Sequence, residues 1–497
     1  MRKEVSATAG PCNDGLSRSL QMVFLAAILA LSLGLNLYGN DFPLGYHVDE
    51  IKKVRFIRDN TQDFNHPILM LQVVRTANAF TRFSDEQDIV ELGRTINAFF
   101  GMLIVACAYL LCRKTSSDRY LPLLAAFAVA TSPIMVVHAH YLKEDIILTF
   151  FLMVSLLILL EYVHRPGWTS AAALGVAMGL ACASHYKGSL LVILCALVSV
   201  LLPGNRRSCL RMLPVVVLSV AAVFLAVNYP LIFDYFTFKR GFIFEYRHAL
   251  GGHYGIKISA IQQYGGFHLI NSLVPGVTAG MAIIGAVAIA WSAVLWRKAH
   301  VSIRILLLYI ALFYMLPELS PLKPFPDFMR YVIPIVPPLI LFALMAVKTL
   351  WSSVPNPGLK MAVPLVMIAI IIYPLYCTIR LVHEINDDTR ARAEAWLQHS
   401  SQKAKYELYT SAKRYDVKSV TRLNVEQERK KGVAFFVSSS FMYERFEFGS
   451  TLPDQHPFVY KTQEKYKRLF ALPFVEFKPE FRSFGFSNPT IRVIDIR

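Results

Sequence analysis

Two pairs of adjacent acidic residues stand at the edges of apolar runs in this sequence. Asp49 and Glu50 lie in "GYHVDEIKK", directly after the first apolar run, and Glu144 and Asp145 lie in "HYLKEDIILTFF", directly before another. A carboxylate in such a place could take a proton from a hydroxyl or an amine. A second carboxylate could orient that group, hold a divalent cation or raise the pKa of the first. The same acids could instead only favour the N-terminus of a helix.

Cationic and aromatic residues accompany these acids. Lys187 lies in "SHYKG", and Arg330 opens "RYVIPIVPP". An arginine fork or a lysine point charge could hold a phosphate, although either side chain could also be an anchor at a membrane surface. The further candidates for substrate binding are His47, His66, Glu144, His185 and Tyr331. The histidines show no spacing typical of a metal site. A divalent metal ion held by the acids stays an open alternative.

Composition places these residues in a polytopic membrane protein. The chain has 497 residues, of which 55% are hydrophobic and 17% charged, and its mean hydropathy is +0.44. Soluble domains are roughly 45–50% apolar and about 25% charged. The net charge of +17 is spread over short loops, which fits membrane topology and anionic lipid headgroups and not a nucleic-acid partner. The seven cysteines form neither a zinc-site spacing nor a disulfide framework.

Apolar runs predict about eleven membrane spans. We place them at about 20–39, 90–112, 120–138, 146–163, 170–185, 188–203, 212–232, 271–296, 303–319, 329–348 and 361–383. Each run is close to the roughly 20 residues that cross a bilayer. The stretch 68–83 is apolar but carries Arg75 and Arg82. It is predicted to be an interfacial or re-entrant helix, with a full span as the alternative.

The distribution of Lys and Arg predicts a cytoplasmic N-terminus and an extracytoplasmic C-terminus. Loops such as "RKTSSDR", "HRPGWT" and "GNRRSCLR" would face the cytoplasm, whereas "HYLKED", "HYKG" and "PLKPFPDF" carry one Lys each and would face outward. Both acidic pairs, Lys187 and Arg330 then lie on the outer face. The long loop 233–270 joins them there, and its mix of aromatics, glycines and basic residues predicts a mobile flap over a lipid-like ligand.

The sequence divides at about residue 383. Residues 1–383 are predicted to form an all-α polytopic membrane module with outer loops 40–89 and 233–270. Residues 384–497 are predicted to form a small extracytoplasmic α/β domain. Within it, "DDTRARAEAWLQ" predicts an amphipathic helix with Ala391, Ala395 and Trp396 toward one face. The segment "VAFFVSSSF" predicts a buried strand, and the alternation over residues 471–496, from "ALPFVEF" to "IRVIDI", predicts further strands.

In these segments the sequence resembles the GT-C glycosyltransferases, and specifically the protein-mannosyltransferase-like family 39 and its bacterial relatives. The matching segments occur in the family's order and span most of residues 20–440. They are "GYHVDEIKK", "FNHPILML", "HYLKEDIILTFFLMVSLLILLEY", "SHYKGSLLVI", "RYVIPIVPP" and "DDTRARAEAWL".

The resemblance implies a polyprenyl-phosphate-linked sugar donor, an acceptor outside the cytoplasmic membrane and inversion at the anomeric carbon. It places the general base at Asp49, with Glu50 beside it, and a second functional acid at Asp145. It makes Lys187 and Arg330 candidate contacts of the donor phosphate. The sequence departs from the commoner His-Pro-Asp-Glu form by having Val48, and it has an additional acid before Asp145. These departures leave open which acid of each pair acts, and relatives differ in their use of a metal.

We therefore expect a membrane glycosyltransferase of the bacterial cytoplasmic membrane that acts on its outer face. The acceptor could be an envelope glycolipid, a polysaccharide or a protein side chain. The alternative is a transporter or flippase of lipid-linked saccharides. Transporters typically show inverted repeats and sites near the bilayer midplane. Here the ionisable residues collect at span ends, and no similarity between the two halves is visible.

Overall fold

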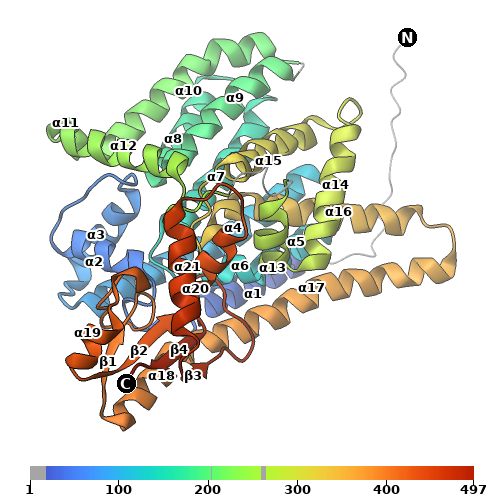
Figure 1. Cartoon of the computed structure of the whole chain (residues 1–497). Helices are drawn as coiled ribbons and strands as arrows, with labels where there is room; N and C mark the ends of the chain where they lie inside the picture. Colours follow the sequence, from blue (N-terminus) through green and yellow to red (C-terminus); the bar gives the residue numbers. More distant parts are fainter. Residues whose placement is uncertain (1–17, 203, 259–264) are drawn as a thin grey trace, which may run out of the picture.

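The computed structural model describes residues 18–202, 204–258 and 265–497. Arg2, Lys3 and Cys12 of the basic N-terminal tail, and residues 259–264 of the expected flap, lie outside the described residues. Up to residue 386 the described chain consists of helices and their connections (Figure 1).

The α-helices of this part differ widely in length. They are α1 (Arg18–Leu37), α2 (Val48–Arg58), α3 (Leu69–Thr81), α4 (Glu86–Thr115), α5 (Leu121–Ala130), α6 (Pro133–Ala139), α7 (Glu144–Tyr162), α8 (Trp168–Ser184), α9 (Leu190–Leu201), α10 (Arg206–Val227), α11 (Pro230–Phe233), α12 (Tyr235–Gly251), α13 (Val274–Val277), α14 (Ala279–Val294), α15 (Val301–Leu319), α16 (Val336–Ser353) and α17 (Pro357–Asn386). Tighter or wider helical turns occur at η1 (Tyr186–Ser189), η2 (Leu269–Leu273) and η3 (Phe328–Ile335).

Each of the eleven expected spans coincides with an apolar helical segment. Among the described residues, seven helices are long and apolar enough to cross a membrane, and α5 with α6 makes an eighth if the bent pair is one span. The pair bends by 53° just before Pro133, whose ring nitrogen cannot donate the hydrogen bond that would continue α5. Three further segments, Trp168–Ser184, Tyr186–Leu201 and Ala279–Val294, are apolar but shorter. The multi-pass membrane fold is thus confirmed, while the count of eleven stays a prediction.

Helix α3 corresponds to the expected interfacial or re-entrant stretch. Its 13 residues are fewer than the roughly 20 of a full span. It packs against α2 and α4, and its buried residues lie toward its N-terminal half. The short length favours the interfacial or re-entrant alternative over the full span.

The connections between helices lie at the two ends of the helical module, and α7 runs from one end to the other. Helix α7 starts at Glu144, beside the first acidic pair, and near its other end Glu161 pairs with Lys114 at 2.5 Å. Its 19 residues correspond to about 28 Å of helix. At that far end the Asn205 amide donates to the carbonyl of His164 at 2.9 Å. Basic loops that were expected to share one side therefore do lie together.

The C-terminal region builds a four-stranded sheet in the order β1-β2-β4-β3. Its elements are α18 (Thr389–Ser400), β1 (Lys403–Tyr406), η4 (Val420–Arg422), α19 (Val425–Lys430), β2 (Val433–Ser439), α20 (Ser440–Ser450), α21 (Pro457–Leu469), β3 (Phe474–Phe477) and β4 (Ile491–Asp495). Strands β1 and β2 are parallel, and β4 runs antiparallel to both β2 and β3. The small C-terminal α/β structure is confirmed, including the buried strand β2 and the strands β3 and β4 within residues 471–496.

Helix α18 forms as expected but buries a different face from the predicted one. The buried residues are Thr389, Arg390, Ala393 and Leu397. Of the predicted face, Trp396 is half-buried and packs against Phe435, but Ala391 and Ala395 are exposed, so the prediction was wrong for the two alanines. The reason is a buried ion pair, which the pattern of apolar residues along the helix does not predict. The Asp388 carboxylate accepts from the backbone amide and the guanidinium of Arg390, which turns Arg390 inward.

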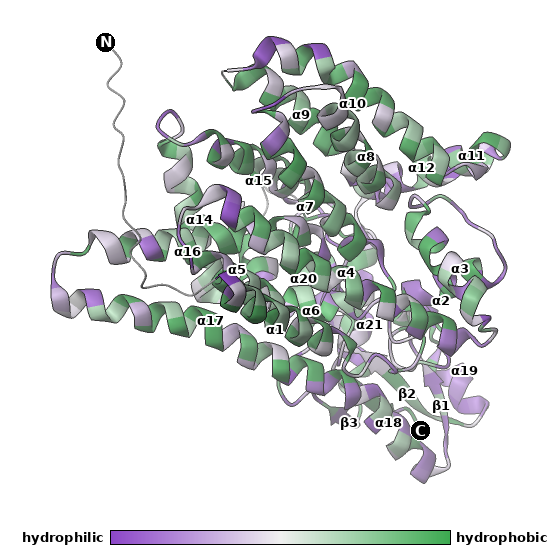
Figure 2. Cartoon of the chain, turned by 180° about the vertical axis from the view of Figure 1, so that it is seen from behind, coloured by the Kyte–Doolittle hydropathy of each residue, from purple (hydrophilic) through white to green (hydrophobic). Residues whose placement is uncertain are grey.

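The C-terminal region rests on the start of α2. Arg390 donates to the carbonyl of Tyr46 at 3.0 Å, and the hydroxyls of Tyr141 and Ser487 are 2.8 Å apart. Figure 1 shows this orange and red region beside the blue helix α2. Figure 2 shows hydrophobic colouring along α1, α5, α14 and α17, whereas hydrophilic colouring gathers around α18 and α19. The sheet thus sits at the polar end of the helices, where the acidic pairs lie.

Candidate active site

A cavity of about 630 Å³ opens at this polar end, and we call it the main cavity. Its wall consists of the start of α2 with the following loop, the starts of α3 and α7, the turn between α8 and α9, helix α12, and the segment from the end of α15 to η3. Tyr409 and Phe486 from the C-terminal region complete it. The volume is within the roughly 300–1,000 Å³ of small-molecule sites.

Most of the expected site residues line the main cavity. They are Asp49, His66, Glu144, Asp145, His185, Lys187, Arg330 and Tyr331. Glu50 and His47 are fully buried and lie behind the wall. The tertiary structure thus brings together residues that are as far apart in sequence as Asp49 and Arg330.

Asp49 is the acid of the first pair that faces the cavity. Its side chain is 42% exposed, and its carboxylate accepts from Lys143 at 2.6 Å and from Arg330 at 3.4 Å. Desolvation of Asp49 in the cavity wall raises its pKa, but Lys143 and Arg330 outweigh this effect and hold the pKa well below its usual range. Asp49 is therefore a carboxylate at neutral pH, held in place by two cations.

Glu50 points in the opposite direction and makes a buried ion pair. One oxygen accepts from Arg94 Nη2 at 2.6 Å, and the other accepts from Arg94 Nε at 3.1 Å and from the backbone amide of Leu142 at 2.8 Å. Arg94 also donates to the carbonyls of Asn40 and Phe42. Both carboxylate oxygens are thus engaged. The pair ties α2 to α4 and to the turn before α7.

The second acidic pair also divides, although both members line the cavity. Glu144 forms a buried ion pair with Lys53. Asp145 is 7% exposed and interacts electrostatically with Arg330, Lys143 and Lys187. Its position at the first turn of α7 also suits the positive end of the helix dipole.

The two expected phosphate contacts converge on one aromatic ring. The Lys187 ammonium lies 3.6 Å from the centroid of the Tyr331 ring, and the Arg330 guanidinium carbon lies 5.4 Å from it. Arg330 also donates to Asp327 at 3.4 Å. Lys187 makes no close ion pair with any described residue, and its ammonium faces the cavity. Burial lowers the pKa of Lys187 to about 7, and a bound anion would favour its charged form. Lys187 is therefore the basic side chain most available to an anionic ligand.

The expected histidines fall into two groups. The rings of His66 and His185 lie together in the wall, with centroids 4.9 Å apart. His47 instead lies between the rings of Tyr141 and Phe486, with centroid distances of 4.6 and 4.0 Å. Burial lowers the pKa of His47 well below its usual range, so it is neutral. Its role here is packing between α2 and the C-terminal region.

Several residues of the cavity were missed by the sequence reasoning: Lys53, Lys143, Glu245, Asp327 and Tyr409. Two of them had a local signal, because Lys53 follows Asp49 by one helical turn and Lys143 directly precedes the second acidic pair. Asp327 and Tyr409 had none. Among the described residues, no group of three or more His, Cys, Asp or Glu side chains is arranged to hold a metal ion.

Comparisons with known proteins agree with this geometry. Residues 83–237 match the family model of dolichyl-phosphate-mannose-protein mannosyltransferase. The matched segment is about a third of the chain, and over these residues the chain is similar to that family. The resemblance expected from the sequence is thereby confirmed.

Solved structures show the same fold at low sequence identity. ArnT from Cupriavidus metallidurans, solved bound to undecaprenyl phosphate, is 14% identical with a TM-score of 0.56, over 96% of this chain and 98% of that one. An oligosaccharyltransferase from Archaeoglobus fulgidus, tethered to an acceptor peptide, is 12% identical with a TM-score of 0.54, over 95% of this chain and 74% of that one. No curated protein matches the sequence.

Proposed function

We propose that this protein is a glycosyltransferase that moves a sugar from a polyprenyl-phosphate donor to an acceptor on the outer face of a bacterial cytoplasmic membrane, with inversion at the anomeric carbon. One observation carries the proposal. A partly exposed carboxylate, Asp49, shares a cavity with Lys187 and Arg330, two cations at one aromatic ring. A base and an anion-binding group within one cavity are what sugar transfer from a phosphate requires.

In the proposed reaction Asp49 accepts the proton of the acceptor's nucleophilic hydroxyl or amine. The nucleophile forms a bond to the anomeric carbon while the bond from that carbon to the phosphate oxygen breaks. The electron pair of the broken bond leaves on the polyprenyl phosphate, whose added charge Lys187 and Arg330 stabilise. Attack opposite to the leaving group inverts the configuration. Asp145 is proposed to orient the acceptor, and Glu50 to position Asp49.

The ion pairs of Asp49 suggest how its basicity is adjusted. Lys143 and Arg330 keep Asp49 ionised, which also makes it a weak base. A donor phosphate competes with Asp49 for Arg330, because both accept from the same guanidinium. When the donor binds, Asp49 loses part of its cationic environment and its pKa rises toward the normal range. The base is then strongest when the donor is in place.

The apolar rim of the cavity supports a lipid-linked donor. Phe242 and Phe244 of α12 and Leu316 of α15 line the main cavity, yet their exposed fractions are 44%, 53% and 44%. They therefore connect the cavity to the surface of the helices. A polyprenyl chain can leave the cavity across these side chains into the bilayer, where apolar contacts carry no penalty.

The proposal is tested with a deletion strain and the purified protein. Envelope glycans of the deletion strain are compared with those of its parent by mass spectrometry, and one glycan class should lack a single sugar unit. Wild type should restore it, whereas Asp49→Asn, at equal expression, should not. Purified wild type in nanodiscs should also transfer the sugar within a lipid and envelope extract of the deletion strain, and release polyprenyl phosphate. Unchanged glycans, or a purified protein without transfer, would contradict the proposal.

A further inference from the structure

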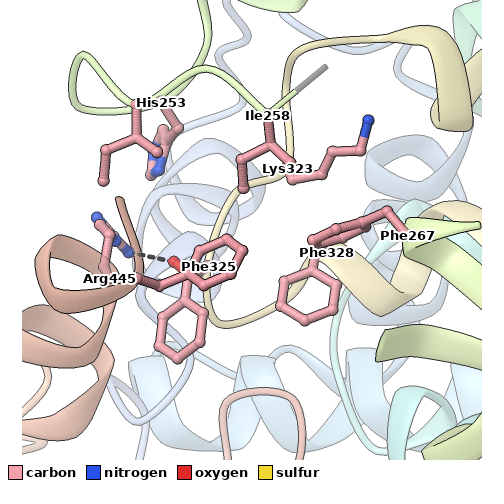
Figure 3. Close-up of a pocket in the computed structure, with 9 residues that line it drawn as sticks. His253, Ile258, Phe267, Lys323, Phe325, Phe328 and Arg445 are labelled. Carbon is pink, nitrogen blue, oxygen red and sulfur yellow. Dashed lines mark hydrogen bonds between the residues drawn. The ribbon is translucent and has the colours of Figure 1, made fainter. Parts of the chain in front are cut away.

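A second, smaller pocket adjoins the main cavity on the side of the C-terminal region (Figure 3). Its volume is about 20 Å³, enough for a small functional group and not for a sugar ring. His253 and Phe325 line both this pocket and the main cavity. A ligand in the main cavity can therefore extend one of its groups into the smaller pocket.

The pocket contains a buried arginine with free donors. Arg445 of α20 is 3% exposed, and it donates from Nη2 to the carbonyl of Phe325. Its Nε and Nη1 are buried and have no hydrogen-bond partner among the described residues. A buried cation with unmade hydrogen bonds is costly, so a native structure that contains one suggests an absent partner.

The residues that line the pocket beside Arg445 supply no negative charge, and Glu407, which interacts with Arg445 electrostatically, is already engaged by Ser438, Tyr466 and the backbone amide of Val420. The other lining residues are aromatic or aliphatic, apart from His253 and Lys323. Burial lowers the pKa of His253 to about 2, so this ring is neutral. The ammonium of Lys323 donates to the carbonyls of Glu318 and Ser320 and its charge is balanced by the Glu318 carboxylate, and Figure 3 shows it directed away from Arg445. The free charge in the pocket is thus the single positive charge of Arg445.

Tyr409 joins Arg445 to the main cavity. The guanidinium carbon of Arg445 lies 5.9 Å from the centroid of the Tyr409 ring, and Tyr409 itself lines the main cavity. Tyr409 interacts electrostatically with both Arg445 and Asp49. The pocket is therefore linked to the proposed base by the C-terminal region and not by the segments that carry Lys187.

We propose that this pocket is an acceptor subsite in which Arg445 binds a carboxylate of the acceptor. The inference rests on the proposed function, because it assigns the acceptor end of the same cavity. A carboxylate carries one negative charge and matches the one free positive charge, whereas a phosphate monoester dianion would be left half-compensated in an apolar pocket. The acceptor is accordingly an acidic molecule whose carboxylate sits at Arg445 while its nucleophile faces Asp49.

The test uses the full chain in nanodiscs and trifluoroacetate as a carboxylate probe, observed by ¹⁹F NMR relaxation. Wild type should bind the probe, and Arg445→Met should weaken binding by about tenfold or more through loss of a charge-assisted contact. Phe448→Trp should have a similar effect by filling the pocket, because Phe448 lines it without touching the charge. Arg468→Met, at an exposed position of α21, is the matched control and should bind as wild type does.

Competition and a donor-side measurement complete the design. Acetate should displace the probe at lower concentration than inorganic phosphate, and neutral trifluoroethanol should show no dependence on Arg445. Equal probe binding by wild type and by folded Arg445→Met and Phe448→Trp, or stronger competition by phosphate, would overturn the proposal. Undecaprenyl phosphate binding should be unchanged in Arg445→Met. If wild type itself failed to bind undecaprenyl phosphate, the proposed function would fail while the probe result for Arg445 stood.

Discussion

At the scale of single residues, the two acids of the first pair are adjacent in sequence but have different surroundings. Asp49 and Glu50 are consecutive in α2, so their side chains leave the helix about 100° apart. Asp49 therefore reaches the main cavity, while Glu50 reaches Arg94 in the helix packing. A carboxylate can act as a base only if an oxygen can approach the substrate, and both oxygens of Glu50 are already engaged.

The first prediction concerns Asp49 as the base. Asp49→Asn keeps the size of the side chain but cannot accept a proton, so single-turnover transfer should fall about 10²–10⁴-fold. Undecaprenyl phosphate binding should persist, since the substitution frees Arg330 and Lys143 from their carboxylate partner. Arg330→Ala should instead weaken both binding and transfer. Asp59→Asn, which alters an exposed pair with Arg58 at the other end of α2, is the control. Near-normal transfer by Asp49→Asn would rule out the assigned role.

The second prediction concerns Glu50 as a positioning residue. Glu50→Gln leaves the fully buried Arg94 without its anionic partner, which typically costs about 3–5 kcal/mol. The apparent Tm in detergent should therefore drop by several degrees. Glu161→Gln breaks an ion pair in which Glu161 is 59% exposed, so it should change Tm little. A Glu50→Gln protein as stable as wild type but inactive would indicate chemistry at Glu50 instead of positioning.

At the scale of elements, α12 closes the main cavity through a close contact of backbones. A Cβ at Gly241 would lie 2.2 Å from the carbonyl oxygen of Asp63 and 2.6 Å from the carbonyl carbon of Phe64. Only glycine allows α12 to approach this loop so closely. The approach brings Phe242 and Glu245 to the cavity wall. Burial raises the pKa of Glu245, which shows how far the helix shields this side of the cavity.

The third prediction tests this contact. Gly241→Ala should displace α12 and weaken undecaprenyl phosphate binding, with a penalty of about 1–3 kcal/mol as for other overpacked sites. Gly251→Ala lies on the same helix, where a Cβ would meet nothing within 4 Å, so it should bind as wild type does. Isothermal titration or ligand-induced thermal shifts in nanodiscs would measure both variants. Equal affinity in the two would mean that the position of α12 does not matter for the donor.

At the scale of the whole molecule, the fold separates a loop-rich end with the cavity from an end with basic loops. Lys348 pairs with Asp118 at 2.8 Å, and Asn205 donates to His164, so connections distant in sequence meet at the basic end. The positive-inside rule predicts that this end faces the cytoplasm. The C-terminal sheet, which rests on Tyr46 beside α2, belongs to the other side.

The fourth prediction is therefore topological. A phosphatase-type reporter, active only outside the cytoplasm, should be active when fused at Asp388 and inactive when fused at Asn205. A reporter that is active only in the cytoplasm should give the reverse pattern. Activity of the cytoplasmic reporter at Asp388 would contradict this prediction. It would mean that the C-terminal region, with Arg445, does not lie on the outer face.

Much of this architecture could be predicted because its signals are local. Apolar runs of span length mark membrane helices, since the bilayer demands a stretch of consecutive apolar residues. Acids and cations at the ends of these runs identified most of the cavity wall, and the order of short motifs indicated the superfamily. Strand β2 was predictable for the same reason, because a run of buried apolar residues is continuous in sequence.

Only the tertiary structure decided which groups act together. The partners Glu50 and Arg94 are 44 residues apart, Asp49 and Lys143 are 94 apart, and Asp49 and Arg330 are 281 apart. No local period encodes such distances, because each pairing depends on how separate helices pack. The inward turn of Arg390, the close approach at Gly241 and the unmet donors of Arg445 have the same origin. Each depends on a contact, or a missing contact, between groups that are distant in sequence and close only in the folded protein.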